Sequence, residues 1–169
     1  MTDSKLQHYT DSIHYELEQT ARLMRILTLQ LFEKLEISIS PDEYFALDTV
    51  SINAGICQRD LAKLLLKDRA NTGRILNSLE EKGFITRFID TKNNRLVKKM
   101  GITEAGLREL GSINKKIKRY FDGITKKIST EEVDRVHEAL KKFRLDLEKN
   151  VNTLTCLTKG SGIFVLNYC

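Results

Sequence analysis

Residues 58–103 restrict the possible folds of this 169-residue chain more than any other segment. They open with two short amphipathic segments, QRDLAKLLLK and ANTGRILNSLEEKG, in which apolar residues recur at helical spacing. Two β-capable runs follow, FITRFID and RLVKKMGI, with the polar residues 91–94 between them as a turn. Two short helices followed by a hairpin predict a helix-turn-helix with a β-wing, so the chain is expected to read double-stranded DNA.

Helix start signals divide the rest of the chain. Ser40 and Glu43 form a capping-box pattern at the start of a helix that precedes the DNA-reading segment. Asp68, Thr103 and Ser129 each stand where a helix N-cap is expected. These signals predict a DNA-binding domain at residues 40–103, between an N-terminal helix within residues 1–36 and two C-terminal helices within residues 104–158. Residues 159–169 form a tail to which no role is assigned.

The flanking regions carry long apolar stripes. From about residue 6 to residue 36, and again after residue 103, large apolar residues recur at helical spacing. The stripe of the last helix is nearly heptad and comprises Val133, Val136, Leu140, Phe143, Leu147, Val151 and Leu154. Such faces pack either within one chain or between two chains. Residues 40–103 are too few to cover three long apolar helices, which favours a homodimer.

The expected fold class is therefore mainly α with a small β-wing: a winged helix-turn-helix flanked by long dimerisation helices. The composition, 41% hydrophobic and 30% charged, is typical of a folded soluble protein. No apolar run reaches membrane-spanning length and no secretory signal is visible, so a cytoplasmic location is expected. The three cysteines and three histidines show no metal-ligand spacing, so no metal, cofactor or catalytic site is expected.

Positive charge is concentrated in the segment that is expected to read DNA. Residues 55–102 contain 11 Lys or Arg against 5 Asp or Glu, whereas residues 1–54 contain 4 against 9. Neutralising DNA phosphates requires such a local excess rather than a high overall charge. A solvated face on an ordinary basic protein is the alternative reading of the charge alone.

Several motifs together resemble the MarR family of bacterial regulators. They are the helix start SPDEYFAL, the segment QRDLAKLL, the run NSLEEKGFITR, a wing that closes at Arg95 and the helix start GITEAG. The resemblance covers roughly residues 10–155. It implies a homodimer that binds a pseudo-palindromic operator, usually as a repressor. It also implies a response to a small aromatic or phenolic effector, as in many members, or to cysteine oxidation, as in some.

Two features depart from the family pattern. Asn94 precedes Arg95 where an acidic residue is common, so the internal salt bridge of the wing is in doubt unless Asp90 supports it. Gly73 stands where threonine is frequent in the recognition helix, and it costs about 1 kcal/mol of helix propensity relative to alanine. One reading is that Gly73 permits close approach to DNA.

Residue chemistry predicts how the recognition helix reads DNA. Arginine pairs with guanine, asparagine pairs with adenine, and the methyl groups of alanine and threonine contact the thymine methyl. Arg74 also matches the recurrent arginine of the family's recognition helix. Base contacts are expected from Arg69, Ala70, Asn71, Thr72 and Arg74.

Further DNA contacts are expected on both sides of this helix. Gln58 and Arg59 begin the preceding helix, whose N-terminal amides are expected to point at the DNA backbone. Asn77 is either a phosphate contact or a solvated side chain. The wing tip is expected to enter or edge the minor groove, where a narrow groove attracts arginine, through Lys92, Asn93, Asn94 and Arg95.

Regulation is predicted from position alone. Tyr15, Phe45 and Tyr120 are candidate walls of an effector pocket, chosen from the family-like layout. Cys57 stands at a helix N-terminus, where a thiolate is favoured, so it is a candidate redox sensor; the alternative is a small core residue.

An alternative function is a winged-helix module that binds proteins and has no specific affinity for DNA. Acidic neighbours that neutralise Arg69, Arg74 and Arg95 would favour that alternative.

Overall fold

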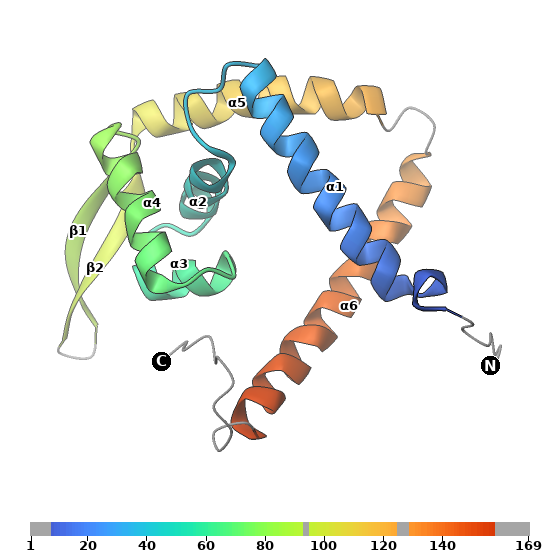
Figure 1. Ribbon diagram of the computed structural model, residues 1–169. Coiled ribbons are helices and arrows are strands. Elements are labelled where there is room, and N and C mark those ends of the chain that lie inside the picture. Colours follow the sequence, from blue (N-terminus) through green and yellow to red (C-terminus); the bar gives the residue numbers. More distant parts are fainter. Residues whose placement is uncertain (1–7, 93–94, 125–128, 158–169) are drawn as a thin grey trace.

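The computed structural model describes the backbone of residues 8–92, 95–124 and 129–157, and the side chains of these residues except 92, 95, 124 and 152–157. The elements follow one another as η1 (Tyr9–Asp11), α1 (Ile13–Lys34), α2 (Pro41–Ile52), α3 (Gln58–Leu64), α4 (Arg69–Glu81), β1 (Ile85–Lys92), β2 (Arg95–Ile102), α5 (Glu104–Ile124) and α6 (Thr130–Leu157). The expected fold class is confirmed: long helices flank a three-helix unit that ends in a β-hairpin (Figure 1).

The winged unit is built around one apolar core. α2, α3, α4 and the hairpin bury side chains that include Leu47, Leu61, Leu76, Leu79 and Met100, each no more than 1% exposed. Burying such a side chain stabilises the fold by about 1.5–3 kcal/mol. β1 and β2 pair antiparallel in a register that runs from Ile85 opposite Ile102 to Lys92 opposite Arg95. The core therefore holds α4 and the wing as one unit.

The start of α3 is fastened to the edge of the hairpin. The Gly55 amide donates to the carbonyl of Met100 at 3.1 Å, and the Met100 amide donates to the carbonyl of Ile56 at 3.0 Å. Gly55 has a φ of +76°, a conformation that glycine adopts without strain. These bonds fix the entry to the helix-turn-helix against β2.

Three predicted boundaries are corrected. The first helix begins at Ile13, not near residue 6, because the Ser12 hydroxyl caps it and accepts from the Tyr15 amide. α3 ends at Leu64 rather than residue 67, because Leu66 has a φ of +51° and the chain leaves the helix. β1 extends to Lys92, so the first two residues of the expected turn at 91–94 belong to the strand.

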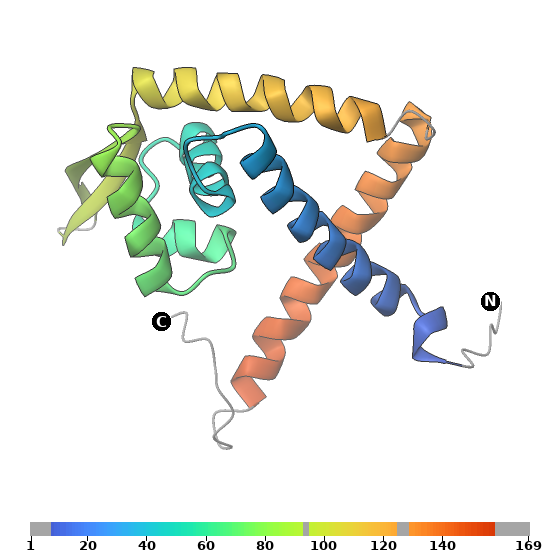
Figure 2. The ribbon, with the colours of Figure 1, turned by 45° about the horizontal axis from the view of Figure 1, so that its top comes forward.

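The terminal helices extend away from the winged unit. α5 begins at the wing and runs along the side of α2 that is opposite α3 (Figure 1). α1 and α6 cross each other in both views (Figures 1 and 2). Where they meet, the rings of His14 and Phe143 lie 6.1 Å apart. Much of their apolar surface stays uncovered: Leu23 is 65% exposed, Val136 is 56% exposed and Leu140 is 43% exposed.

Glu43 is a buried carboxylate that joins α2 to α4. One carboxylate oxygen accepts from the Ser40 amide at 2.6 Å, which completes the predicted capping box. The other accepts from the Ser78 hydroxyl at 2.6 Å and from the Lys82 ammonium at 2.7 Å. Burial raises the pKa of Glu43, but the hydrogen bonds from Lys82, Ser78 and Ser40 outweigh burial and lower the pKa to about 2.

Replacement of Glu43 by glutamine tests this network. Because the folded-state pKa lies below the ordinary value of 4.5, the carboxylate contributes stability above pH 4.5, and this contribution is lost as the pH falls towards 2. We expect Glu43→Gln to reduce the free energy of unfolding at pH 7 by about 3 kcal/mol and by much less at pH 3. Urea denaturation at both pH values measures this, with Glu33→Gln on the exposed side of α1 as control. An equal loss at pH 3 and pH 7 would contradict the assignment.

Candidate nucleic-acid interface

α4 has one buried face and one outward face. Ile75, Leu76 and Leu79 point into the core, as predicted. Ala70 and Arg74 are separated by four residues and lie on the opposite face, where both are exposed. The N-cap is Asp68, as predicted, and its carboxylate accepts from the Asn71 amide at 2.7 Å. The first two turns of α4 therefore present an arginine to solvent from a capped, well-anchored helix.

Arg74 is an exposed cation on this face. Within the described part of the chain, no hydrogen-bond or ion-pair partner is found for its guanidinium. Arg69 lies at the start of the helix and is also exposed. An exposed guanidinium such as that of Arg74, which no carboxylate of the described residues engages, is suited to a guanine edge or a phosphate.

Thr72 does not belong to the outward face, which corrects the prediction that it contacts bases. It is 0% exposed, and its hydroxyl donates to the carbonyl of Asp68 at 2.8 Å. The reason is helical spacing: Thr72 precedes Ile75 by three residues and Leu76 by four, so it shares their buried face.

Asn71 and Arg59 lie at the margins of the surface. Asn71 is half-buried. It lies seven residues before Ser78, so the two share one side of α4, and this side faces α2 because Ser78 donates to Glu43. Arg59 is exposed at the start of α3, and its guanidinium lies 3.5 Å from the carboxylate of Asp60. This loose surface pair leaves Arg59 able to reach a phosphate.

The half-buried Gln58 side chain reaches across to α4. Its side-chain amide donates to the carbonyl of Arg69 at 2.8 Å. The predicted phosphate contact would have to compete with this internal bond.

Asn77 is joined to the wing by Arg87, a residue that the sequence reading missed. One guanidinium nitrogen of Arg87 donates to the Asn77 side-chain oxygen at 2.7 Å, and the other donates to Glu80 at 2.8 Å. Arg87 follows the buried Ile85 by two residues, so strand alternation places it on the inner face of β1. That alternation was the available signal, since a charged residue on an inner face requires a partner. Asn77 is thus not merely solvated: its oxygen accepts from Arg87, and a phosphate contact would have to come from its Nδ2 group.

The wing is stiffened by an ion pair between its strands. Lys99 of β2 donates to the carboxylate of Asp90 on β1. This hydrogen bond is the largest cause that lowers the pKa of Asp90, and a hydrogen bond from the Thr91 amide is the next largest. Asp90 is therefore paired with Lys99 within the wing. The side chains of Lys92, Asn93, Asn94 and Arg95 lie outside the described residues.

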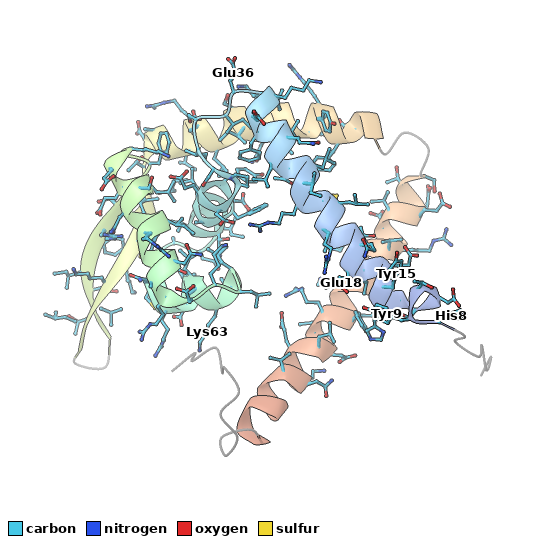
Figure 3. All side chains as sticks on the ribbon, viewed as in Figure 1. His8, Tyr9, Tyr15, Glu18, Glu36 and Lys63 are labelled. Carbon is cyan, nitrogen blue, oxygen red and sulfur yellow. The ribbon has the colours of Figure 1, made fainter. Side chains whose placement is uncertain are left out.

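The three candidate effector residues are not brought together by the single chain. Tyr15 packs edge-on against Tyr9 at the start of α1, and the Tyr9 hydroxyl donates to Glu18 (Figure 3). Phe45 contacts Tyr44, and Tyr120 contacts Phe121. A hollow between the end of α2 and α3 is lined by other residues, which are Asn53, Ala54, Gly55, Ile56, Asp60, Lys63 and Leu64.

Cys57 stands at the N-cap of α3, as predicted, but its side chain does not cap the helix. Its thiol donates to the carboxylate of Asp60, with the sulfur 3.1 Å from the oxygen. This bond is the largest of the causes that lower the pKa of Asp60. The hydrogen bond uses the protonated thiol.

Within the described residues, His, Cys, Asp and Glu side chains form no group of three or more that could hold a metal ion. No helix in the same residues has the length and apolar character needed to cross a membrane.

Helices α3 and α4 and the hairpin that follows them define a winged helix-turn-helix protein. The model of the MarR family matches residues 39–97, which cover α2, α3, α4, β1 and the start of β2. YybA of Bacillus subtilis (strain 168), an uncharacterised HTH-type transcriptional regulator, is 24% identical over 135 residues, which are 79% of this chain and 89% of YybA.

Solved structures of transcriptional regulators have a similar fold. The structure of the transcriptional regulator SlyA is 27% identical, with a TM-score of 0.68 over 82% of this chain and 96% of SlyA. The complex of S. aureus MepR with DNA is 21% identical, with a TM-score of 0.65 over 83% of this chain and 99% of MepR, and shows a shared fold. Over the winged unit the chain is therefore similar to the MarR family, and its fold is that of the transcriptional regulator SlyA and of MepR.

Replacement of Arg74 by alanine separates base reading from general attraction to DNA. We expect Arg74→Ala to weaken binding to a cognate site by about 1–3 kcal/mol and to affect random DNA much less, because a base contact is lost. Fluorescence anisotropy with both duplexes at one salt concentration measures the two affinities. Arg108→Ala, at an exposed arginine on α5, is the matched control. Equal losses on both duplexes would make Arg74 a phosphate contact.

Proposed function

We propose that this protein is a homodimeric, sequence-specific transcriptional regulator of the bacterial cytoplasm that binds double-stranded DNA at a pseudo-palindromic operator, most simply as a repressor. The observation that carries the proposal is the outward face of α4, where Arg74 is exposed and has no acidic partner among the described residues. Had a carboxylate neutralised this arginine, the alternative of a protein-interaction module would have gained support.

Two further observations support DNA as the partner. The segment with the largest positive excess, residues 55–102, contains α3, α4 and the wing. MepR, which shares this fold, has been solved in complex with DNA. Phosphate contacts then come from Arg59 and from the wing tip, including Arg95, while base contacts come from Arg69, Ala70, Asn71 and Arg74.

Sequencing the DNA that copurifies with the protein tests the proposal directly. A regulator of this class enriches a short motif that is repeated with inverted symmetry. A protein-interaction module recovers no enriched sequence, and its affinity for DNA is the same for every duplex. That second result would overturn the proposed function.

The uncovered faces of the terminal helices support a homodimer. α6 presents Val133, Val136, Leu140 and Leu147 at 41–56% exposure, along the near-heptad stripe that the sequence predicts. α1 adds Leu23 and other exposed apolar residues. Contiguous apolar surface of this kind is uncommon on a soluble monomer and is typical of an interface. A second copy of the chain is the partner that a symmetric operator requires.

Replacement of Leu140 by glutamate tests the homodimer. We expect the wild-type protein to sediment at twice the 19.4 kDa chain mass at micromolar concentration. Leu140→Glu should sediment as a monomer or a weakened dimer, since it places a charge in an apolar contact while preserving helix propensity. Lys141→Glu, at the next position and off the stripe, should remain dimeric. A folded wild-type monomer at that concentration would contradict the proposal.

We further propose that a small aromatic or phenolic acid regulates DNA binding. The pocket for it, with Tyr15, Phe45 and Tyr120 as candidate walls, would have to be completed by the second chain, because these residues are apart in one chain. Redox sensing at Cys57 is the alternative mode of regulation.

A panel of small aromatic acids and phenols separates the two modes. We expect at least one compound to weaken operator binding, because a ligand with different affinities for two dimer geometries shifts the population between them. Peroxide should have a smaller effect, since the Cys57 thiol is engaged by Asp60. The effector proposal is wrong if the whole panel leaves affinity unchanged while Cys57→Ser abolishes a strong peroxide response.

A further inference from the structure

Gln58 and Gly73 form a contact between the two helices of the helix-turn-helix. Gln58 is the first residue of α3, and its side chain crosses to α4, where the amide nitrogen donates to the carbonyl of Arg69 at 2.8 Å. Gly73, one turn after Arg69, lies directly beneath this side chain. A Cβ atom at residue 73 would lie 3.0 Å from the Gln58 amide nitrogen, a tight contact that would require the Gln58 side chain to move by a few tenths of an ångström.

The Gln58 contact accounts for a glycine at position 73, because the backbone there does not require one. Gly73 lies inside α4, and the glycines with a positive φ in the described chain are Gly55 and Gly83. Glycine is unfavourable inside a helix compared with alanine. The space that it leaves is filled by the Gln58 side chain, so its role is found between α3 and α4.

The contact lies at the end of α4 that carries the DNA-reading residues. Arg69 provides the carbonyl that Gln58 engages, and Arg74 directly follows Gly73. On the opposite flank of α4, Glu43 holds Ser78 and Lys82 nearer the other end of the helix. A shift at the Gln58 contact would therefore pivot the first turns of α4 about its better-anchored second half.

We propose that Gln58 is a positioning residue for DNA recognition: its side chain, lying over Gly73 and bound to the Arg69 carbonyl, sets the placement of the base-reading turns of α4. The proposal rests on the proposed DNA-binding function and deepens it. It assigns sequence specificity to a residue that acts through α4, and it assigns Gly73 to helix packing in place of close approach to DNA.

A thermal-unfolding cycle tests the contact without DNA. Alanine in place of glycine inside a helix ordinarily raises the unfolding midpoint by about 2–4 °C in a chain of this size. We expect Gly73→Ala alone to give no rise, and Gly73→Ala in a Gln58→Ala background to give the ordinary rise. Gly111→Ala on α5, where a Cβ meets no atom within 4 Å, is the control that should show the rise in both backgrounds. An equal rise from Gly73→Ala with and without Gln58 would overturn the contact.

DNA binding tests the functional part of the proposal. We expect Gln58→Ala and Gly73→Ala each to reduce the ratio of cognate to random affinity by about tenfold, and the double variant to lose no more than Gln58→Ala alone. Gln58→Met retains bulk over Gly73 but cannot donate a hydrogen bond, so it should lose discrimination as Gln58→Ala does. All variants are compared at one salt concentration on the duplex that copurifies with the wild-type protein.

The other outcomes are distinct. Equal losses on cognate and random DNA would make Gln58 a phosphate contact and overturn the proposal. Additive losses in the double variant would mean that Gly73 acts at the DNA and not beneath Gln58, which would also overturn it. Failure of the wild-type protein to prefer any duplex would instead refute the proposed function, while the thermal cycle would still report on the contact.

Discussion

Glu43 is the residue on which the geometry of the DNA-reading surface most depends. A buried carboxylate is tolerated only where hydrogen bonds replace its water, and Glu43 obtains them from Ser40, Ser78 and Lys82. Two of these partners belong to the second half of α4 and its C-cap, so the need to satisfy one charge fixes that half against α2. Arg87 anchors the same half to the wing. α4 is thus held by polar bonds on two flanks and by apolar packing beneath.

The local features of the fold could be predicted from the sequence, because they depend on neighbouring residues. The capping box at Ser40, the cap at Asp68 and the inward face of α4 are set by signals a few residues apart, and the structure has them as expected. Features that depend on distant residues could not be predicted. Thr72 is not such a feature, because its spacing of three and four residues from Ile75 and Leu76 was a local signal for its burial. Gln58 is such a feature: it was assigned to phosphate because it begins α3, and its bond to the Arg69 carbonyl, which spans 11 residues, gives no local signal.

The terminal helices are connected to α4 through α2. The Tyr44 hydroxyl of α2 donates to the Asn114 side chain of α5 at 2.7 Å, and Ser38, just before α2, donates to Glu109 of α5 at 2.7 Å. α2 in turn holds α4 through Glu43. In a homodimer built from α1, α5 and α6, a change in the way two chains meet would therefore reach both copies of α4. This chain of contacts explains how a ligand distant from DNA could alter the spacing of two recognition helices.

The central claim is that two copies of α4 read DNA together, and a hydroxyl-radical footprint on the DNA that copurifies with the protein tests it most directly. The account predicts two protected half-sites whose centres lie about one helical turn, roughly 34–36 Å, apart on one face of the duplex. Protection that is uniform along the duplex, or the same on a scrambled sequence, would contradict it.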